Sequence, residues 1–198
     1  MKTPQRTVEL RTEELRDRAA ELRAGDRAVV SGVVYTARDA AHKAMFRCLD
    51  GGGALPFDVR GAVIYYAGPT PARGKWAVGS CGPTTSGRMD AFAPGLYDMG
   101  LAATIGKGER SEDVRLAIIR NRAVYLCAVG GAGALIARHI TAAEEVAYGE
   151  LGCESVKRLI VEGLPLTVAI DSNGGNIFSR EREAGGDFKN GAGNYGVT

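Results

Sequence analysis

The chain has 198 residues, 45% hydrophobic and 24% charged, an ordinary globular composition that is long enough to bury a core. Its formal net charge of +2 is too small to indicate a nucleic-acid partner, and no long apolar run predicts a membrane span. The N-terminal segment turns acidic and polar where a signal peptide would need an apolar region, so we expect a cytoplasmic protein.

The cysteines and histidines are too scattered to form a recognisable ligand motif. The four cysteines are Cys48, Cys81, Cys127 and Cys153, with no Cys-x-x-Cys pair among them. This spacing argues against a disulfide framework and against a self-contained zinc site. We therefore expect free thiols and no metal bound by this chain alone.

Apolar runs and turn residues divide the chain into alternating strands and helices. In chain order we predict an alternating stretch that becomes helical (8–22), a strand (27–35), a helix (40–49), strands (62–67, 75–80 and 102–105), a helix (112–121), a strand (123–129), a helix (131–139), an edge strand (144–147), a helix (154–161) and a last strand (166–171). Apolar strands of this kind need cover on both faces, which predicts a single layered α/β domain. The polar, glycine-rich sequence at the end predicts a domain at residues 1–178 and a loose tail at 179–198.

Cations follow several of the predicted strands. Arg38 lies at the junction between the strand at 27–35 and the helix that follows it, Arg88 lies in a glycine-flanked segment, and Lys107 stands between two glycines. Ligands of open α/β sheets bind beyond the carboxyl ends of the strands, where helix N-termini favour anions. Two arginines and a lysine suit a small dianion. A surface pair of Arg38 with Asp39, and simple turns at the glycines, are the alternatives, so the residues alone indicate an anion-binding domain.

Several segments, taken together, resemble one known family. They lie at residues 36–43 (Thr-Ala-Arg-Asp-Ala-Ala-His-Lys), 66–69 (Tyr-Ala-Gly-Pro), 82–90 (Gly-Pro-Thr-Thr-Ser-Gly-Arg-Met-Asp), 106–108 (Gly-Lys-Gly), 129–135 (Val-Gly-Gly-Ala-Gly-Ala-Leu), 150–152 (Glu-Leu-Gly, with Glu154) and 168–171 (Val-Ala-Ile-Asp). In order and approximate spacing they are similar to the β subunit of class I iron–sulfur fumarases and tartrate dehydratases. The first and third segments are the most specific.

The resemblance implies a swivelling β/β/α domain and a partner. In two-subunit members, an α subunit supplies the cysteines for a four-iron, four-sulfur (4Fe-4S) cluster, which explains why this chain lacks cluster-like spacing. A homodimer of the β domain or an α2β2 assembly is then expected, acting on a small dicarboxylate.

The resemblance also implies a role for each matching residue. Arg38 would hold a substrate carboxylate, and Thr84 would be the base that removes a proton beside a carboxylate. Arg88 would bind substrate and set the field around Thr84, and Lys107 would complete the anionic pocket. Fumarate hydration is the leading activity; tartrate dehydration, mesaconate hydration and a stand-alone dicarboxylate-binding module stay open.

Overall fold

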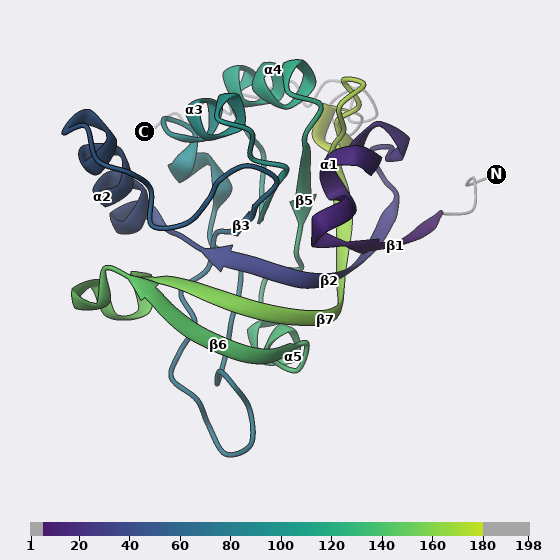
Figure 1. The fold of residues 1–198 in the computed structure, drawn as a ribbon. Helices are drawn as coiled ribbons and strands as arrows, with labels where there is room; N and C mark the ends of the chain where they lie inside the picture. The colour runs from purple at the N-terminus through teal and green to yellow at the C-terminus, as the bar shows by residue number, and fades with distance from the viewer. Residues whose placement is uncertain (1–5, 180–198) are drawn as a thin grey trace, which may run out of the picture.

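The protein is described by a computed structural model that covers residues 6–179 (Figure 1). The strands are β1 (Thr7–Arg11), β2 (Arg27–Thr36), β3 (Val63–Tyr65), β4 (Ala103–Gly106), β5 (Val124–Cys127), β6 (Ile140–Ala147) and β7 (Val156–Ile170). The α-helices are α1 (Leu15–Arg18), α2 (Asp39–Asp50), α3 (Ala93–Asp98), α4 (Glu112–Arg120) and α5 (Gly133–Ala137). Four 3₁₀ helices complete the described elements: η1 (Thr12–Glu14), η2 (Ala19–Glu21), η3 (Ser86–Met89) and η4 (Gly149–Glu154).

All seven strands belong to one sheet. Strands β1 to β5 are parallel neighbours in chain order. The fifteen-residue β7 runs antiparallel to them, pairing with β2 along most of its length and with β5 near its end. The strands β2, β3, β4, β5 and β7 therefore form a closed ring of pairings, and β1 and β6 lie outside the ring.

The short parallel strands separate two hydrophobic cores. Alternate side chains of a strand point to opposite faces, so Val63 and Tyr65 of β3 enter one cluster and Ile64 the other. In β5, Val124 and Leu126 likewise belong to one cluster and Tyr125 belongs to the other. The strands are buried on both faces, as the apolar runs predict.

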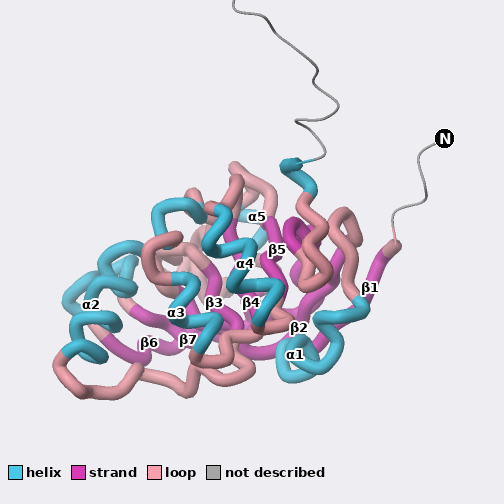
Figure 2. Tube along the Cα trace, turned by 90° about the horizontal axis from the view of Figure 1, so that it is seen from above, coloured by secondary structure: helices cyan, strands magenta, loops and turns pink. Residues whose placement is uncertain are grey.

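Helices α2, α3 and α4 cover one face of the sheet. They lie together on the same side of β3 and β5 in Figure 1, and the view from above shows α3 and α4 over β3 and β4 (Figure 2). Their buried side chains join one core cluster. On the opposite side lie α5 and the long loop that follows β3 (Figure 1). Because β2 to β5 are parallel, their carboxyl ends lie at the same edge of the sheet, and α2 begins soon after the end of β2.

Most predicted elements are confirmed, but two are wrong. Residues 75–80 form no strand, since the ring of strand pairings is complete without them, and only an isolated Arg73–Trp76 bridge is found there. Residues 154–161 were expected to form a helix, but from Val156 they begin β7. The pattern of charged and apolar residues here fits the period of a helix and that of a strand. Pairing with the long strand β2 stabilises the extended form.

Helix α3 lies in a segment that the sequence did not assign to any element. Its early Pro94 is typical of the first turn of a helix. The tail predicted at 179–198 lies, apart from Ser179, outside the described residues, so the division after residue 178 stays a prediction. Within residues 6–179, no helix has the length and apolarity needed to cross a membrane.

Candidate functional site

Arg38 is the residue that precedes the first turn of α2, directly beyond the end of β2. Its guanidinium lies 3.4 Å from a carboxylate oxygen of Glu154, and its Nη1 would be 3.2 Å from a Cβ placed at Gly68. Glycine at position 68 therefore leaves room for the arginine. Glu154 also accepts a hydrogen bond from the backbone N–H of Ala40 at 3.2 Å, so one carboxylate caps the helix and holds Arg38.

Arg88 reaches the same place from η3. Its Nε donates to Asp39 at 2.8 Å, and Asp39 lies 4.0 Å from the Arg38 guanidinium. Asp39 thus joins the two arginines that the sequence predicts to be ligands of an anion. The Arg88 side chain is about half exposed, at 51%, and within residues 6–179 its terminal nitrogens have no protein partner.

Thr84 lies beside Tyr66, the residue that follows β3. Its N–H donates to the carbonyl of Tyr66 at 2.7 Å, and the preceding Pro83 forms a bridge with Ala67. The side chain is half-buried, and its hydroxyl has no hydrogen-bond partner in the described part of the chain. A free hydroxyl at this position is open to a ligand.

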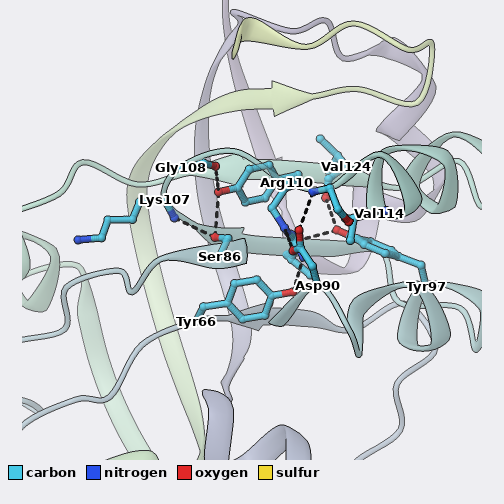
Figure 3. A network of polar contacts seen from close by, with 12 residues as sticks. Tyr66, Ser86, Asp90, Tyr97, Lys107, Gly108, Arg110, Val114 and Val124 are labelled. Carbon is cyan, nitrogen blue, oxygen red and sulfur yellow. Dashed lines mark hydrogen bonds and ion pairs between the residues drawn. The ribbon is translucent and has the colours of Figure 1, made fainter. Parts of the chain in front are cut away.

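Lys107 is tied by its backbone and not by its amine. Its N–H donates to Ser86 Oγ at 3.0 Å, its carbonyl accepts from Ser86 N at 2.9 Å, and Thr85 forms a bridge with it. In Figure 3 the Lys107 side chain extends away from these contacts. Gly106 allows this approach because a Cβ there would overlap Ser86 Oγ.

A buried polar network lies beneath these loops (Figure 3). Its centre is Arg110, whose side chain is fully buried and whose Nε donates to Asp90 at 2.7 Å. The terminal nitrogens of Arg110 donate to Thr104 Oγ1 at 3.1 Å and to the Tyr66 hydroxyl at 3.3 Å. The guanidinium also lies over the rings of Tyr66 and Tyr125, 5.2 and 4.9 Å from their centres.

This environment keeps Arg110 charged. Burial lowers the pKa of its guanidinium, but the oxygens of Tyr66 and Tyr97 and the Asp90 carboxylate raise that pKa above its ordinary value. Burial also raises the pKa of the Tyr125 phenol, so this phenol stays protonated; it donates to the Gly108 carbonyl at 2.8 Å and lies 2.9 Å from Ser86 Oγ. The network is therefore a buried cation paired with one carboxylate and surrounded by neutral hydroxyl groups.

His42 lies under the first turn of α2 and is neutral. Burial lowers its pKa to about 4, and its Nδ1 lies 2.9 Å from the Arg38 carbonyl. Since a carbonyl only accepts, Nδ1 carries the proton. The backbone N–H of His42 donates to the same carbonyl at 2.8 Å, which fixes the turn that presents Arg38.

The described residues do not offer the donors of an iron–sulfur cluster. No group of three or more His, Cys, Asp or Glu side chains with metal-binding geometry occurs in residues 6–179. The four cysteines are free, and burial raises the pKa of the Cys81 thiol to about 12, which disfavours a thiolate ligand.

The four site residues predicted from sequence all lie at the carboxyl ends of β2, β3 and β4. Contacts connect Arg38 to Arg88 through Asp39, and Thr84 to Lys107 through the backbone of neighbouring residues. Sequence reasoning did not identify Asp39, Glu154, Asp90 or Arg110 as members of the site. Asp39 could have been found as the neighbour of Arg38, but nothing local marks Arg110 as buried.

Fold and site together define a mixed α/β domain with cationic side chains gathered at one edge of its parallel strands. The model of the family described as "Fumarase C-terminus" matches residues 1–181. The chain therefore belongs to the fumarase C-terminal domain family, whose β-subunit-like members it resembles in its motifs.

Individual relatives agree with this assignment. Fumarate hydratase 2 of Leishmania major is 34% identical over 85% of this chain, and the aerobic class I fumarate hydratase of Escherichia coli K12 is 35% identical over 76%. The matches span only 30% and 28% of the length of those two relatives. A Methanocaldococcus jannaschii protein, provisionally named an L(+)-tartrate dehydratase subunit beta, is 36% identical over 80% of this chain and 84% of its own length.

Proposed function

We propose that this chain is the β-type half of an iron–sulfur hydro-lyase that interconverts fumarate and (S)-malate together with an α-type partner. Residues 1–178 would form the swivelling β/β/α domain of that enzyme, and the cytoplasm would be its compartment. The observation that carries the proposal is the placement of the candidate residues at the carboxyl ends of neighbouring strands, where Asp39 joins Arg38 to Arg88 and a bridge joins Thr85, next to Thr84, to Lys107.

The cations would bind the two carboxylates of the substrate. Arginine forks bind carboxylates through paired hydrogen bonds, and the terminal nitrogens of Arg88 lack protein partners within residues 6–179. Arg38 would take a substrate carboxylate while Glu154 orients its guanidinium. The Lys107 amine, which extends away from the buried network in Figure 3, would add a third positive charge.

Thr84 would exchange the proton beside a substrate carboxylate. During malate dehydration its deprotonated oxygen would take that proton as the carbon–carbon double bond forms, and the hydroxyl would leave as water with a proton from an acid of the α-type partner; the reverse step would return the proton. A threonine hydroxyl is a weak base, so nearby cations must favour its deprotonated form. Arg88 lies four residues further on, and Lys107 is joined to the neighbouring Thr85 by a bridge.

A partner would have to hold the 4Fe-4S cluster, because the described residues of this chain lack the donors for it. When bound, such a cluster supplies a Lewis-acidic iron for the substrate's carboxylate and hydroxyl. In this proposal the chain itself contributes the cations and Thr84, and assembles with the partner as an α2β2 complex or through a β-domain homodimer.

Tartrate dehydration is the second candidate, and one observation favours it. The M. jannaschii relative is matched over 84% of its length, whereas the fumarate hydratases are matched over about a third or less. Malate and tartrate differ by one hydroxyl group, and a pocket that does not hydrogen-bond that group discriminates only weakly between them. Mesaconate hydration, and a module that binds a dicarboxylate without catalysis, stay as further outcomes.

The test is to co-express the chain with an α-type partner and purify the complex without oxygen. Fumarate absorbance is then followed after malate is added, with each chain alone as the control. Turnover by the complex alone supports the proposal. If a cluster-loaded complex does not turn over malate but dehydrates tartrate or hydrates mesaconate, the assignment of the substrate changes accordingly. Two chains that never associate favour the binding module.

Site variants then test the roles of single residues. Arg38→Ala and Arg88→Ala should each lower kcat/KM by about 100-fold or more, because each loses a charge-assisted contact in the transition state. Thr84→Ala should lower kcat with a smaller effect on KM. Normal turnover in the two arginine variants would contradict the binding roles, and an unchanged kcat in the threonine variant would remove Thr84 as the base.

A further inference from the structure

We propose that Arg110 is a positioning residue, which locks the loop of Thr84 and Arg88 against the loop of Lys107. This proposal rests on the proposed function, because that function makes the two loops part of an active site. The positioning of the loops can nevertheless be tested without substrate. Arg110 belongs to neither the cations that face the ligand nor the sequence motifs that suggested the site. Its side chain is fully buried, and in Figure 3 it lies next to Asp90.

The first connection runs from Arg110 to the Thr84 loop. Asp90 ends the segment that carries Thr84 and Arg88, and one oxygen of its carboxylate accepts a hydrogen bond from Arg110 Nε. The other oxygen accepts from the backbone N–H of Ser111, where α4 is about to begin. Asp90 is thus held on both sides by the segment that follows β4.

The second connection runs through Tyr125. Its ring packs against the Arg110 guanidinium, and its hydroxyl donates to the Gly108 carbonyl at 2.8 Å and shares a hydrogen bond with Ser86 Oγ at 2.9 Å. Ser86 Oγ in turn accepts from the Lys107 N–H at 3.0 Å. One phenol therefore joins the two loops directly below Thr85 and Lys107.

The arrangement offers more than is needed for packing alone. A buried charge is costly unless it is paired, and the pair is no more stabilising than apolar residues of similar volume. What the charged fork adds is direction, because its three nitrogens have separate partners directly after β3, on β4 and in the Asp90 segment: Tyr66, Thr104 and Asp90. Such a fork fixes the relative position of the segments that hold the candidate site.

The experiment uses the full chain, with amide hydrogen exchange as the readout that needs no substrate. Arg110→Met should speed exchange at the N–H groups of Ser86 and Lys107, which bond across the two loops. Tyr125→Phe keeps the ring over the guanidinium but deletes the hydroxyl, and should speed exchange at Lys107 with little loss of fold. It also serves if the methionine variant fails to fold.

The matched control is Arg120→Gln. Arg120 pairs with Asp98 at 2.7 Å between α4 and α3, with both side chains about half exposed and away from the loops. It should leave exchange at Ser86 and Lys107 unchanged. If both Arg110→Met and Tyr125→Phe also leave that exchange unchanged, Arg110 does not position the loops, and the proposal is overturned whatever the enzyme's substrate is.

The second readout is turnover in the complex with the α-type partner, measured well below the unfolding temperature of each variant. Arg110→Met should lower kcat by about 100-fold with a smaller change in KM, and Arg110→Lys, which keeps the charge, should recover part of it. A purely structural role predicts a lower unfolding temperature with normal kcat in the folded enzyme, and that result overturns the proposal. Faster exchange in a complex whose parent shows no hydro-lyase activity keeps the positioning role and rejects the proposed function.

Discussion

Gly106 offers a sharp steric test of how the two loops meet. A Cβ at this residue would overlap Ser86 Oγ and would lie 3.0 Å from Tyr66 Cδ2. Ser86 and Tyr66 are both fully buried, so neither can swing into solvent. Because the backbone of Gly106 is not in the left-handed region, Gly106→Ala changes packing and leaves backbone strain aside.

The expected cost follows from overpacking and from lost hydrogen bonds. Forcing an extra methyl into a packed core costs about 1–3 kcal/mol. For a domain of this size, each kcal/mol lowers Tm by about 2–4 °C, so Gly106→Ala should unfold about 2–12 °C below the parent. A displaced Ser86 Oγ also loses its hydrogen bonds with Lys107 N and the Tyr125 hydroxyl, so turnover should fall in the complex as well.

The assay is thermal unfolding followed by circular dichroism, with Gly87→Ala as the control. A Cβ at Gly87 would meet only the Glu109 carbonyl oxygen, at 3.8 Å, although this glycine lies in the same loop. The control should stay within about 2 °C of the parent. Equal Tm values for the parent and Gly106→Ala would refute the steric argument, and with it the close approach of Ser86 to β4.

Three further predictions concern charge, protonation and thiol exposure. Glu154→Gln should lower the free energy of unfolding by about 1 kcal/mol or less, measured by urea denaturation, because its pair with Arg38 is partly exposed to solvent. The pKa of His42 is about 4 in the folded state against 6.5 as its ordinary value, so the unfolded state binds the proton first as pH falls. Stability is therefore unaffected above pH about 6.5 and should drop by about 3 kcal/mol between there and pH about 4. His42→Gln should flatten that slope in pH-dependent denaturation, and an equal slope would contradict the assignment. Under native conditions a thiol reagent should label the exposed Cys153, while the buried Cys81 should react only on unfolding; equal rates would contradict that burial.

The sequence predicts most of the elements because their patterns are local. The strand over 27–35 and the helix over 40–49 are found within one residue of their predicted bounds. The helix predicted at 154–161 is wrong because its outcome is decided by distant residues. Apolar Val156, Leu159 and Val161 fit a helix as well as a strand, and pairing with β2 and β6 selects the strand.

Gly163 and Pro165 add to that difficulty. Both residues usually interrupt a strand, yet β7 continues through them. Gly163 takes a positive φ of 60° and donates to Ser31 Oγ at 2.9 Å, near a shift of register in β2. The irregularity is absorbed by two strands together, which a single-sequence pattern cannot show.

In the candidate site, too, local features could be predicted and contacts between distant residues could not. The cations could be predicted, because strand ends and flanking glycines are local features. Their partners could not, since Arg38 meets Glu154 from 116 positions away in the chain, and Arg110 meets Tyr66 from 44 away. Whether the resemblance assigns the correct roles to Arg38, Thr84, Arg88 and Lys107 stays a prediction.

The carboxylates beside the arginines have a consequence for ligand binding. Asp39 and Glu154 together carry two negative charges next to the two arginines, so local charge is largely balanced before any ligand arrives. A dianion would therefore be bound by direct hydrogen bonds from the unoccupied nitrogens of Arg88, from the Lys107 amine and from Arg38, which it would share with Glu154. An excess of positive charge at the site would contribute little. Recognition of the dianion should depend on direction more than on long-range attraction, because paired charges cancel at a distance. Raising the salt concentration should then weaken dicarboxylate binding only modestly, whereas Asp39→Asn, which frees the arginines from their orienting partner, should weaken it strongly. Calorimetric titration of the complex with malate measures both effects, and tighter binding by Asp39→Asn would show that Asp39 competes with the ligand and does not orient the arginines.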